Sequence, residues 1–159
     1  MTLLVQEKKL IWAAEPKNYT GATMTAEYVS MKGYDHLTIV IQTGAWAAGT
    51  AAVTLLQSTD VTNSLADAAA IAFTSMWSDE VAGGTLVENA VTANTFNLDT
   101  ANKLYVIELD AAQLNVDGGF DCVTLAVASP GANADFYGVI YILGGTRYAG
   151  ATPLAAITD

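Results

Sequence analysis

The chain has 159 residues, of which 52% are hydrophobic and 14% are charged, and its formal net charge is −10. This length and hydrophobicity predict one folded domain with a sizeable core and exclude a disordered chain. Only six Lys and Arg residues oppose sixteen acids, which excludes direct binding to nucleic acid because phosphate contacts need clustered cations. The first 32 residues differ from the rest, since they carry four Lys against three Glu.

The N-terminal 24 residues are predicted to be an arm and a linker, and residues 25–159 a single β domain. Apolar and charged side chains are mixed on both sides of residues 1–12, a pattern typical of an edge strand or of an arm that pairs with another chain. Residues 13–25 contain turn-forming residues and are predicted to be a loop. We expect neither a secretory signal nor a membrane span, because no apolar run is long enough or correctly flanked.

Short runs with alternating apolar residues then follow one another along the chain. Each run ends at glycine, proline, asparagine or aspartate, which predicts strands joined by tight connections. The connection at residues 44–50 is predicted to be a hairpin loop or a folded-back lid, residues 60–69 a helical turn or a wide loop, and residues 111–114 one helical turn. Beyond the first segment, the predicted strands cover residues 27–31, 36–43, 51–58, 70–77, 85–87, 91–98, 103–110, 122–128 and 136–143.

The stretch from residue 119 to residue 143 is predicted to be the centre of the fold. Two strands, 122–128 and 136–143, flank a Ser-Pro-Gly-Ala-Asn-Ala connection, so we interpret them as a hairpin. The second strand is apolar on both faces, which is typical of a strand that is covered on both sides. The whole pattern predicts an all-β protein: an antiparallel β-sandwich or partly closed barrel of about nine or ten short strands with an extended N-terminal arm.

The sequence contains few candidate catalytic residues and no catalytic motif, and we expect that the chain is not an enzyme. His36 is the only histidine and starts a strand on its polar side, where a surface or interface role is expected. Cys122 is the only cysteine and lies inside a strand, which indicates a buried thiol and fits a reducing cytosol. No nucleophile elbow accompanies them, so no catalytic residue and no cofactor is assigned.

Two further groups of residues remain open to more than one interpretation. Four oxygen-bearing side chains around a Gly-Gly turn could bind calcium or could simply form ordinary turns, and no metal is assigned, because the EF-hand pattern is missing. The adjacent acids Asp79 and Glu80, together with Glu88, could form a carboxylate pair or a solvated loop. A set of aromatic residues could line a sugar-binding face, close the core or anchor an interface. They are Trp12, Trp46, Trp77, Tyr19, Tyr28, Tyr34 and Tyr148. The four turn residues are Asp110, Asn115, Asp117 and Asp121.

Several segments in this order resemble a family of small virion structural proteins of tailed bacteriophages. The likeness covers about residues 25–159, and capsid decoration, or cement, proteins match best in size and class. It rests on these runs: Tyr34-Asp35-His36-Leu37-Thr38-Ile39-Val40-Ile41-Gln42-Thr43-Gly44-Ala45-Trp46, Ala52-Val53-Thr54-Leu55-Leu56-Gln57, Leu104-Tyr105-Val106-Ile107-Glu108-Leu109-Asp110, Gly119-Phe120-Asp121-Cys122, Tyr141-Ile142-Leu143 and Arg147-Tyr148-Ala149.

The resemblance implies a non-catalytic protein on the exterior of a virion capsid, assembled in the host cytoplasm. Its implied partners are the phage major capsid protein and copies of itself, with a trimer as the expected assembly, and it binds neither nucleic acid nor membrane directly. A head-tail joining or tail structural protein and a carbohydrate-binding β-sandwich module remain the alternatives. The arm residues expected to meet the capsid are Leu3, Leu4, Val5, Lys8, Lys9, Leu10 and Trp12, and the expected interface aromatics are Trp46, Trp77 and Tyr148.

Overall fold

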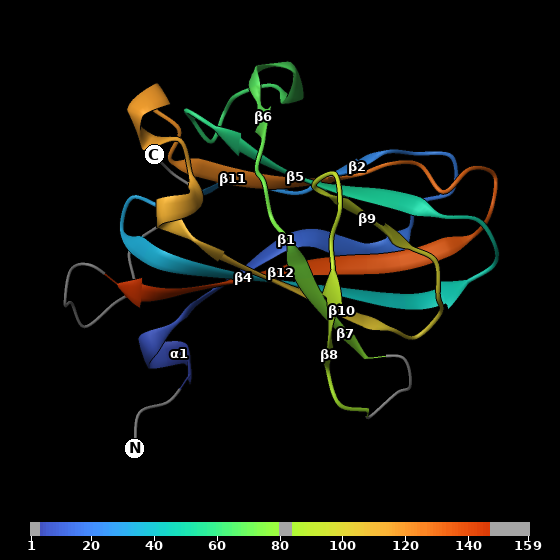
Figure 1. The fold of residues 1–159 in the computed structure, drawn as a ribbon. Helices are drawn as coiled ribbons and strands as arrows, with labels where there is room; N and C mark the ends of the chain where they lie inside the picture. Colours follow the sequence, from blue (N-terminus) through green and yellow to red (C-terminus); the bar gives the residue numbers. More distant parts are fainter. Residues whose placement is uncertain (1–3, 80–83, 147–159) are drawn as a thin grey trace.

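The computed structural model describes residues 4–79 and 84–146, which form two antiparallel β-sheets packed face to face (Figure 1). The fold is an all-β sandwich that is not closed into a barrel, as the alternating sequence pattern predicts. Sheet A has the order β1 (Lys9–Asn18), β12 (Asp135–Thr146), β4 (Tyr34–Trp46), β10 (Leu104–Asp110), β7 (Ser75–Asp79) and β8 (Val87–Ala90).

Sheet B is built mostly of shorter strands. Its order is β2 (Met24–Thr25), β11 (Cys122–Val127), β5 (Ala51–Ser58) and β6 (Ala69–Ala70), while β3 (Val29–Ser30) pairs with β11 and β9 (Thr95–Leu98) pairs with β5. The helical segments are short: α1 (Leu4–Glu7) and the 3-10 turns η1 (Leu65–Asp67), η2 (Ala111–Gln113) and η3 (Val116–Gly118). Within the described residues, no helix is long and apolar enough to cross a membrane.

The core lies between the two sheets and is made by alternate residues of each strand. In β4 the side chains of Leu37, Ile39 and Ile41 are fully buried, and the residues between them face outward. In β12 the same alternation buries valine, leucine and tyrosine side chains, whereas β11 is buried along nearly its whole length. Folding removes the apolar surface of these side chains from water. The burial of the core-facing residues therefore stabilises the packing of the two sheets.

The predicted central hairpin is wrong in its pairing. β11 lies in sheet B and β12 lies in sheet A, so the connection between them crosses from one layer to the other. Both strands are nevertheless internal, because β12 pairs with β1 and β4, and β11 pairs with β5 and with β2 and β3. The alternation of side chains along a strand indicates which residues face the core, but it does not indicate which strand lies next to it. Because packed sheets are only about 10 Å apart, a short loop can connect a strand of one sheet to a strand of the other.

The same correction applies to β3, β4 and β5, which follow one another in sequence. The chain passes from sheet B to sheet A and back to sheet B, so residues 44–50 connect the layers and do not close a hairpin. The predicted strand at 70–77 is likewise divided between β6 in sheet B and β7 in sheet A. The predicted strand at 91–98 begins only at Thr95, because Ala93 and Asn94 have positive φ values of 58° and 57°.

The predicted loop at residues 13–25 is also partly strand, because β1 continues to Asn18 and pairs with β12. The register of β1 shifts between Trp12 and Ala14 and again before Lys17, so Pro16 sits in an irregular part of an edge strand, where a missing N–H is tolerated. Gly138 of β12 lies beneath it, and a Cβ there would come within 2.9 Å of the Pro16 Cβ. Residues 60–69, for which a helical turn and a wide loop are both predicted, contain the 3-10 turn η1, and the helical turn predicted at residues 111–114 is present as η2.

Candidate functional site

The outer face of sheet A carries a continuous row of apolar side chains that runs across five strands. Direct cross-strand pairing joins Trp12 of β1 to Ile140 of β12, Ile140 to Val40 of β4, Val40 to Val106 of β10, and Val106 to Trp77 of β7. Trp12 is 65% exposed and Ile140 is 45% exposed. We call these five residues the apolar row. Apolar side chains aligned on the solvent side of a sheet are typical of an interaction surface.

Neighbouring residues widen this row into a patch, which we call the apolar face: the apolar row together with Leu10, Ile142 and Phe136. Leu10 pairs with Ile142, one step along the strands from Trp12 and Ile140, and both Leu10 and Phe136 are exposed. Val106 has little exposed surface, yet it lies outside the core cluster between the sheets. Its position in the row, beside Trp77, shows that it belongs to the outer layer.

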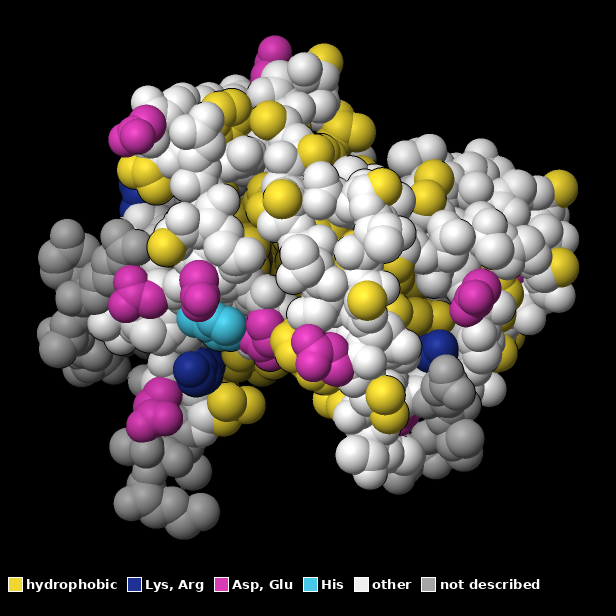
Figure 2. Space-filling model, viewed as in Figure 1, with side chains coloured by type: hydrophobic (Ala, Val, Ile, Leu, Met, Phe, Trp, Pro, Cys, Tyr) yellow, Lys and Arg dark blue, Asp and Glu magenta, His cyan; other side chains and the backbone are white. Residues whose placement is uncertain are grey.

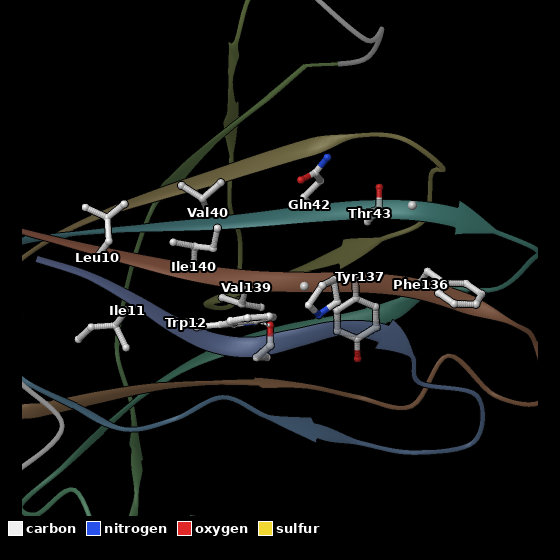
Figure 3. A pocket seen from close by; sticks show the side chains of 14 residues that line it. Leu10, Ile11, Trp12, Val40, Gln42, Thr43, Phe136, Tyr137, Val139 and Ile140 are labelled. Atoms are coloured by element: carbon white, nitrogen blue, oxygen red, sulfur yellow. Dashed lines mark hydrogen bonds between the residues drawn. The ribbon is translucent and has the colours of Figure 1, made fainter. Parts of the chain in front are cut away.

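A groove of about 600 Å³ crosses the part of the apolar face that lies over β1, β12 and β4 (Figure 3). Two glycines help to shape it, because Gly44 and Gly138 present no side chain between the surrounding strands. The indole of Trp12 is held at its rim by a hydrogen bond of 2.9 Å from Nε1 to the carbonyl oxygen of Ala14. Among the residues that the structure describes, no charged side chain lines the groove, although the chain as a whole is strongly acidic. The groove therefore suits an uncharged occupant.

A polar cluster borders the apolar face on β4 and β10. The imidazole of His36 lies between two carboxylates: Nδ1 is 3.0 Å from Asp110 Oδ1, and Nε2 contacts Glu108 Oε2. The hydroxyl of Thr38 donates a hydrogen bond of 2.9 Å to the same Glu108 oxygen. Figure 2 shows the only histidine of the chain beside acidic side chains. Burial alone would lower the pKa of His36, but the hydrogen bonds and charges of Asp110 and Glu108 outweigh it and raise the pKa.

This cluster is not arranged to hold a metal ion. The two carboxylates approach opposite nitrogens of one imidazole ring, so the three side chains cannot converge on a single centre. The groups considered for calcium are also separate: Asp110 contacts His36, while the Asn115 side chain accepts a hydrogen bond from Gly118. Within the described residues, no group of three or more His, Cys, Asp or Glu side chains could hold a metal ion.

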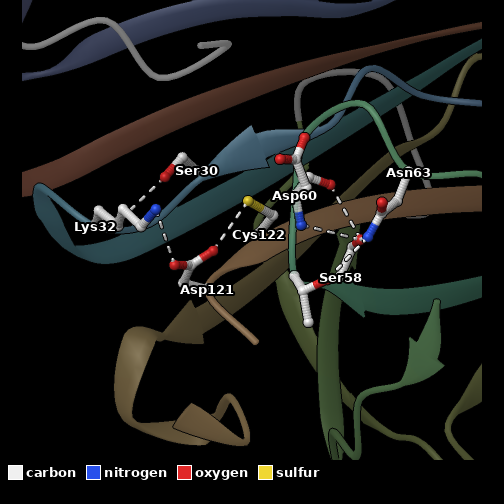
Figure 4. A network of polar contacts seen from close by, with 8 residues as sticks. Ser30, Lys32, Ser58, Asp60, Asn63, Asp121 and Cys122 are labelled. Carbon is white, nitrogen blue, oxygen red and sulfur yellow. Dashed lines mark hydrogen bonds and ion pairs between the residues drawn. The ribbon is translucent and has the colours of Figure 1, made fainter. Parts of the chain in front are cut away.

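Cys122 and Asp121 belong to a separate network at the start of β11 (Figure 4). Cys122 is fully buried, and its Sγ donates to Asp121 Oδ1 across 3.2 Å. The other oxygen of Asp121 lies 3.4 Å from Lys32 Nζ. Since the single histidine lies in the cluster with Glu108 instead, the structure does not assemble a Cys-His pair. Of the acids considered as a carboxylate pair, Glu80 lies outside the described residues.

The structure places the predicted capsid-binding residues in two groups. Leu4, Val5, Leu10 and Trp12 are exposed, and the last two belong to the apolar face, whereas Leu3 lies outside the described residues. Lys8 and Lys9 are partly buried at the start of β1. The predicted binding role of all these residues stays a prediction, because exposure alone does not identify a partner.

The predicted interface aromatics do not form one cluster. Trp77 ends the apolar row, whereas Trp46 packs beside the core with its ring centroid 6.2 Å from that of Tyr137, and Tyr148 lies outside the described residues. The sequence interpretation did not assign Ile140 or Val40 to a site. The sequence does contain apolar residues at the outward-facing positions of β12. Only the register of β12 with β1 and β4 shows that these residues form a row with residues of the neighbouring strands.

No protein-family model and no curated protein matches the sequence. Among solved structures, the SPBc2 prophage-derived protein YomS is similar with 12% identity and a TM-score of 0.43, covering 91% of this chain and 99% of that one. A chain of infectious bursal disease virus, Gx strain, gives 14% identity and a TM-score of 0.43 over 91% of this chain and 35% of that chain. The Tobacco streak virus coat protein gives 5% identity and a TM-score of 0.35, with 94% of each chain covered. At these scores and identities the likenesses assign neither a family nor a function.

Proposed function

We propose that this chain is a structural protein of a tailed-phage virion, which binds the outside of the capsid shell and bridges major capsid subunits without catalysing a reaction. The observation that carries the proposal is the apolar face of sheet A. A single soluble domain has little reason to keep Trp12 and Ile140 exposed within one continuous row, because covering such a row removes apolar surface from water. The resemblance of the sequence to phage virion proteins suggests the major capsid protein as the partner.

The charge distribution supports an orientation in which the apolar face of sheet A is turned toward the shell. The residues of the apolar face carry no charge, and Lys8 and Lys9 stand beside them at the start of β1. Most of the acidic residues belong to the chain beyond residue 32. Docking through sheet A would therefore bury an uncharged surface and leave much of the acidic surface in water, where its charges remain solvated.

The edge of sheet A offers a second means of contact. Within residues 4–79 and 84–146, no strand other than β12 pairs with β1, although the carbonyl of Ala13 accepts a hydrogen bond of 2.8 Å from the Glu27 N–H. An extended capsid segment could pair with the unpaired part of β1 and continue the sheet. In this arrangement the arm residues act as part of the docking surface, and virion assembly in the host cytoplasm brings the partners together.

A sedimentation experiment tests the proposal directly. The purified chain is mixed with shells assembled from the major capsid protein that is encoded in the same genome, and the shells are pelleted. We expect the chain to pellet with the shells, and we expect Ile140→Glu to abolish this by placing a charge in the middle of the apolar row. Val116→Glu is the matched control, because Val116 is 65% exposed but lies on η3. Equal binding by both variants would refute docking through sheet A.

A carbohydrate-binding module is the second candidate, and the setting of Trp12 favours it. Its hydrogen bond to Ala14 fixes the ring beside an uncharged groove, and the exposed side chain of Gln42 lies on the same surface. An immobilised aromatic ring with a nearby amide is suited to contact a sugar ring. Binding of the isolated chain to a panel of immobilised glycans, lost in Trp12→Ala, would support this function over shell binding.

A further inference from the structure

The cluster formed by His36, Glu108 and Asp110 lies directly beside the surface proposed to dock. Glu108 follows Val106 by two residues on β10, so both side chains point outward from sheet A. Thr38, which binds Glu108, pairs with Ile142 of the apolar face. A change in the charge of this cluster would therefore change the electrostatic potential at the edge of the docking surface.

While Asp110 and Glu108 are ionised, the geometry of the cluster favours protons on both nitrogens of the imidazole. A neutral imidazole has one N–H and one lone pair, so it can donate a hydrogen bond to only one carboxylate. The other nitrogen would then turn its lone pair toward the oxygen of Asp110 or of Glu108, which repels it. With both nitrogens protonated, His36 donates to both carboxylates, and the three side chains together carry a charge of about −1.

The other strands packed around His36 do not reverse this preference. On the β12 side, His36 pairs with Gly144, which carries no charge, and the side chain of Lys8 lies over that glycine. On the β10 side stand Asp110 and Glu108, and η2 adds only the neutral Gln113, whose side chain accepts the Asp110 N–H.

Asp35 precedes His36 in β4 and alternates to the opposite side of the strand. The carboxylates therefore dominate the surroundings of the imidazole, in agreement with the raised pKa of His36.

We propose that His36 is a proton-dependent switch of the apolar face, which docks on the shell while the imidazole is doubly protonated and releases as the ring becomes neutral. This inference rests on the proposed function. Docking removes water from the border of the apolar face, and deprotonation of His36 changes the combined charge of His36, Glu108 and Asp110 from about −1 to about −2. A more highly charged border costs more to desolvate, so shell binding and protonation of His36 favour each other.

The first test is a nuclear magnetic resonance titration of the isolated chain. Because the chain contains one histidine, its imidazole signals report His36 without ambiguity. We expect His36 to titrate above the ordinary value of about 6.5, and Glu108→Gln to move the titration down toward that value. A midpoint at or below the ordinary value would overturn the inference, whatever the chain does with shells.

The second test measures shell binding of the wild type and of His36→Gln between pH 6 and pH 9. We expect the affinity of the wild type to fall by about fivefold or more as the pH rises, which is the low end of ordinary coupling between sites, and we expect His36→Gln to lack this step. Equal pH profiles of the two proteins would overturn the switch and leave the proposed function intact. Absence of binding at every pH would refute the proposed function and the switch together.

Discussion

The replacement of Trp12 with alanine should weaken shell binding strongly while leaving the fold almost unchanged. Trp12 is 65% exposed, and a tryptophan side chain offers roughly 200 Å² of contact surface, so docking would bury about 130 Å² of it. At about 25 cal/mol per Å² this burial contributes about 3 kcal/mol, which corresponds to about a hundredfold in affinity. The indole makes one exposed hydrogen bond to Ala14, so its loss should change the free energy of unfolding by about 1 kcal/mol or less.

Shell-binding isotherms and urea denaturation of the same preparations measure the two effects separately. Val116→Ala is the matched control, because Val116 is as exposed as Trp12 but lies on η3. It should bind shells like the wild type. If Trp12→Ala binds within about threefold of the wild type, the indole is not buried on docking, and the assignment of the apolar face is refuted.

Three further predictions concern the fold that supports this face. Gly138→Ala should lower the free energy of unfolding by about 1–3 kcal/mol in urea denaturation, because the new Cβ would lie 2.9 Å from the Cβ of Pro16; an unchanged value would contradict the close approach of β1 to β12. Ile39→Ala should cost about 2–5 kcal/mol in the same assay, since Ile39 is fully buried between the sheets, and a loss below 1 kcal/mol would be inconsistent with that position. Because folding raises the pKa of His36, its stabilising contribution is complete below about pH 6.5 and is lost as the pH rises through the folded-state pKa. The unfolding free energy of the wild type should therefore decline relative to His36→Gln above about pH 6.5, and parallel curves would exclude this linkage.

The sequence predicts the fold class well, because side-chain alternation is a local property. Leu37, Ile39 and Ile41 occupy every second position of one strand, and all three face the core. Pairing is not local: β11 and β12 are close in sequence but lie in different sheets. No residue near the connecting loop distinguishes a hairpin turn from a crossing between two layers, because both need the same turn-forming residues.

The candidate site was predictable only in part for the same reason. The sequence predicts Trp12 and Leu10 at an interface as members of the arm, and it shows the outward apolar residues of β12 as a second hydrophobic side of that strand. Their union into one face depends on the register that pairs Trp12 with Ile140 and Ile140 with Val40. The contact of His36 with Glu108 joins residues 72 positions apart, so the sequence pattern of either strand alone does not reveal it.

A reconstruction of the shell with the chain bound, imaged by electron cryomicroscopy, tests the central claim most directly. The proposed function predicts density for the sandwich on the outside of the shell, with β1, β12 and β4 of sheet A against the capsid protein and sheet B turned away. Density at the neck or along the tail, or contact with the shell through sheet B, would contradict it.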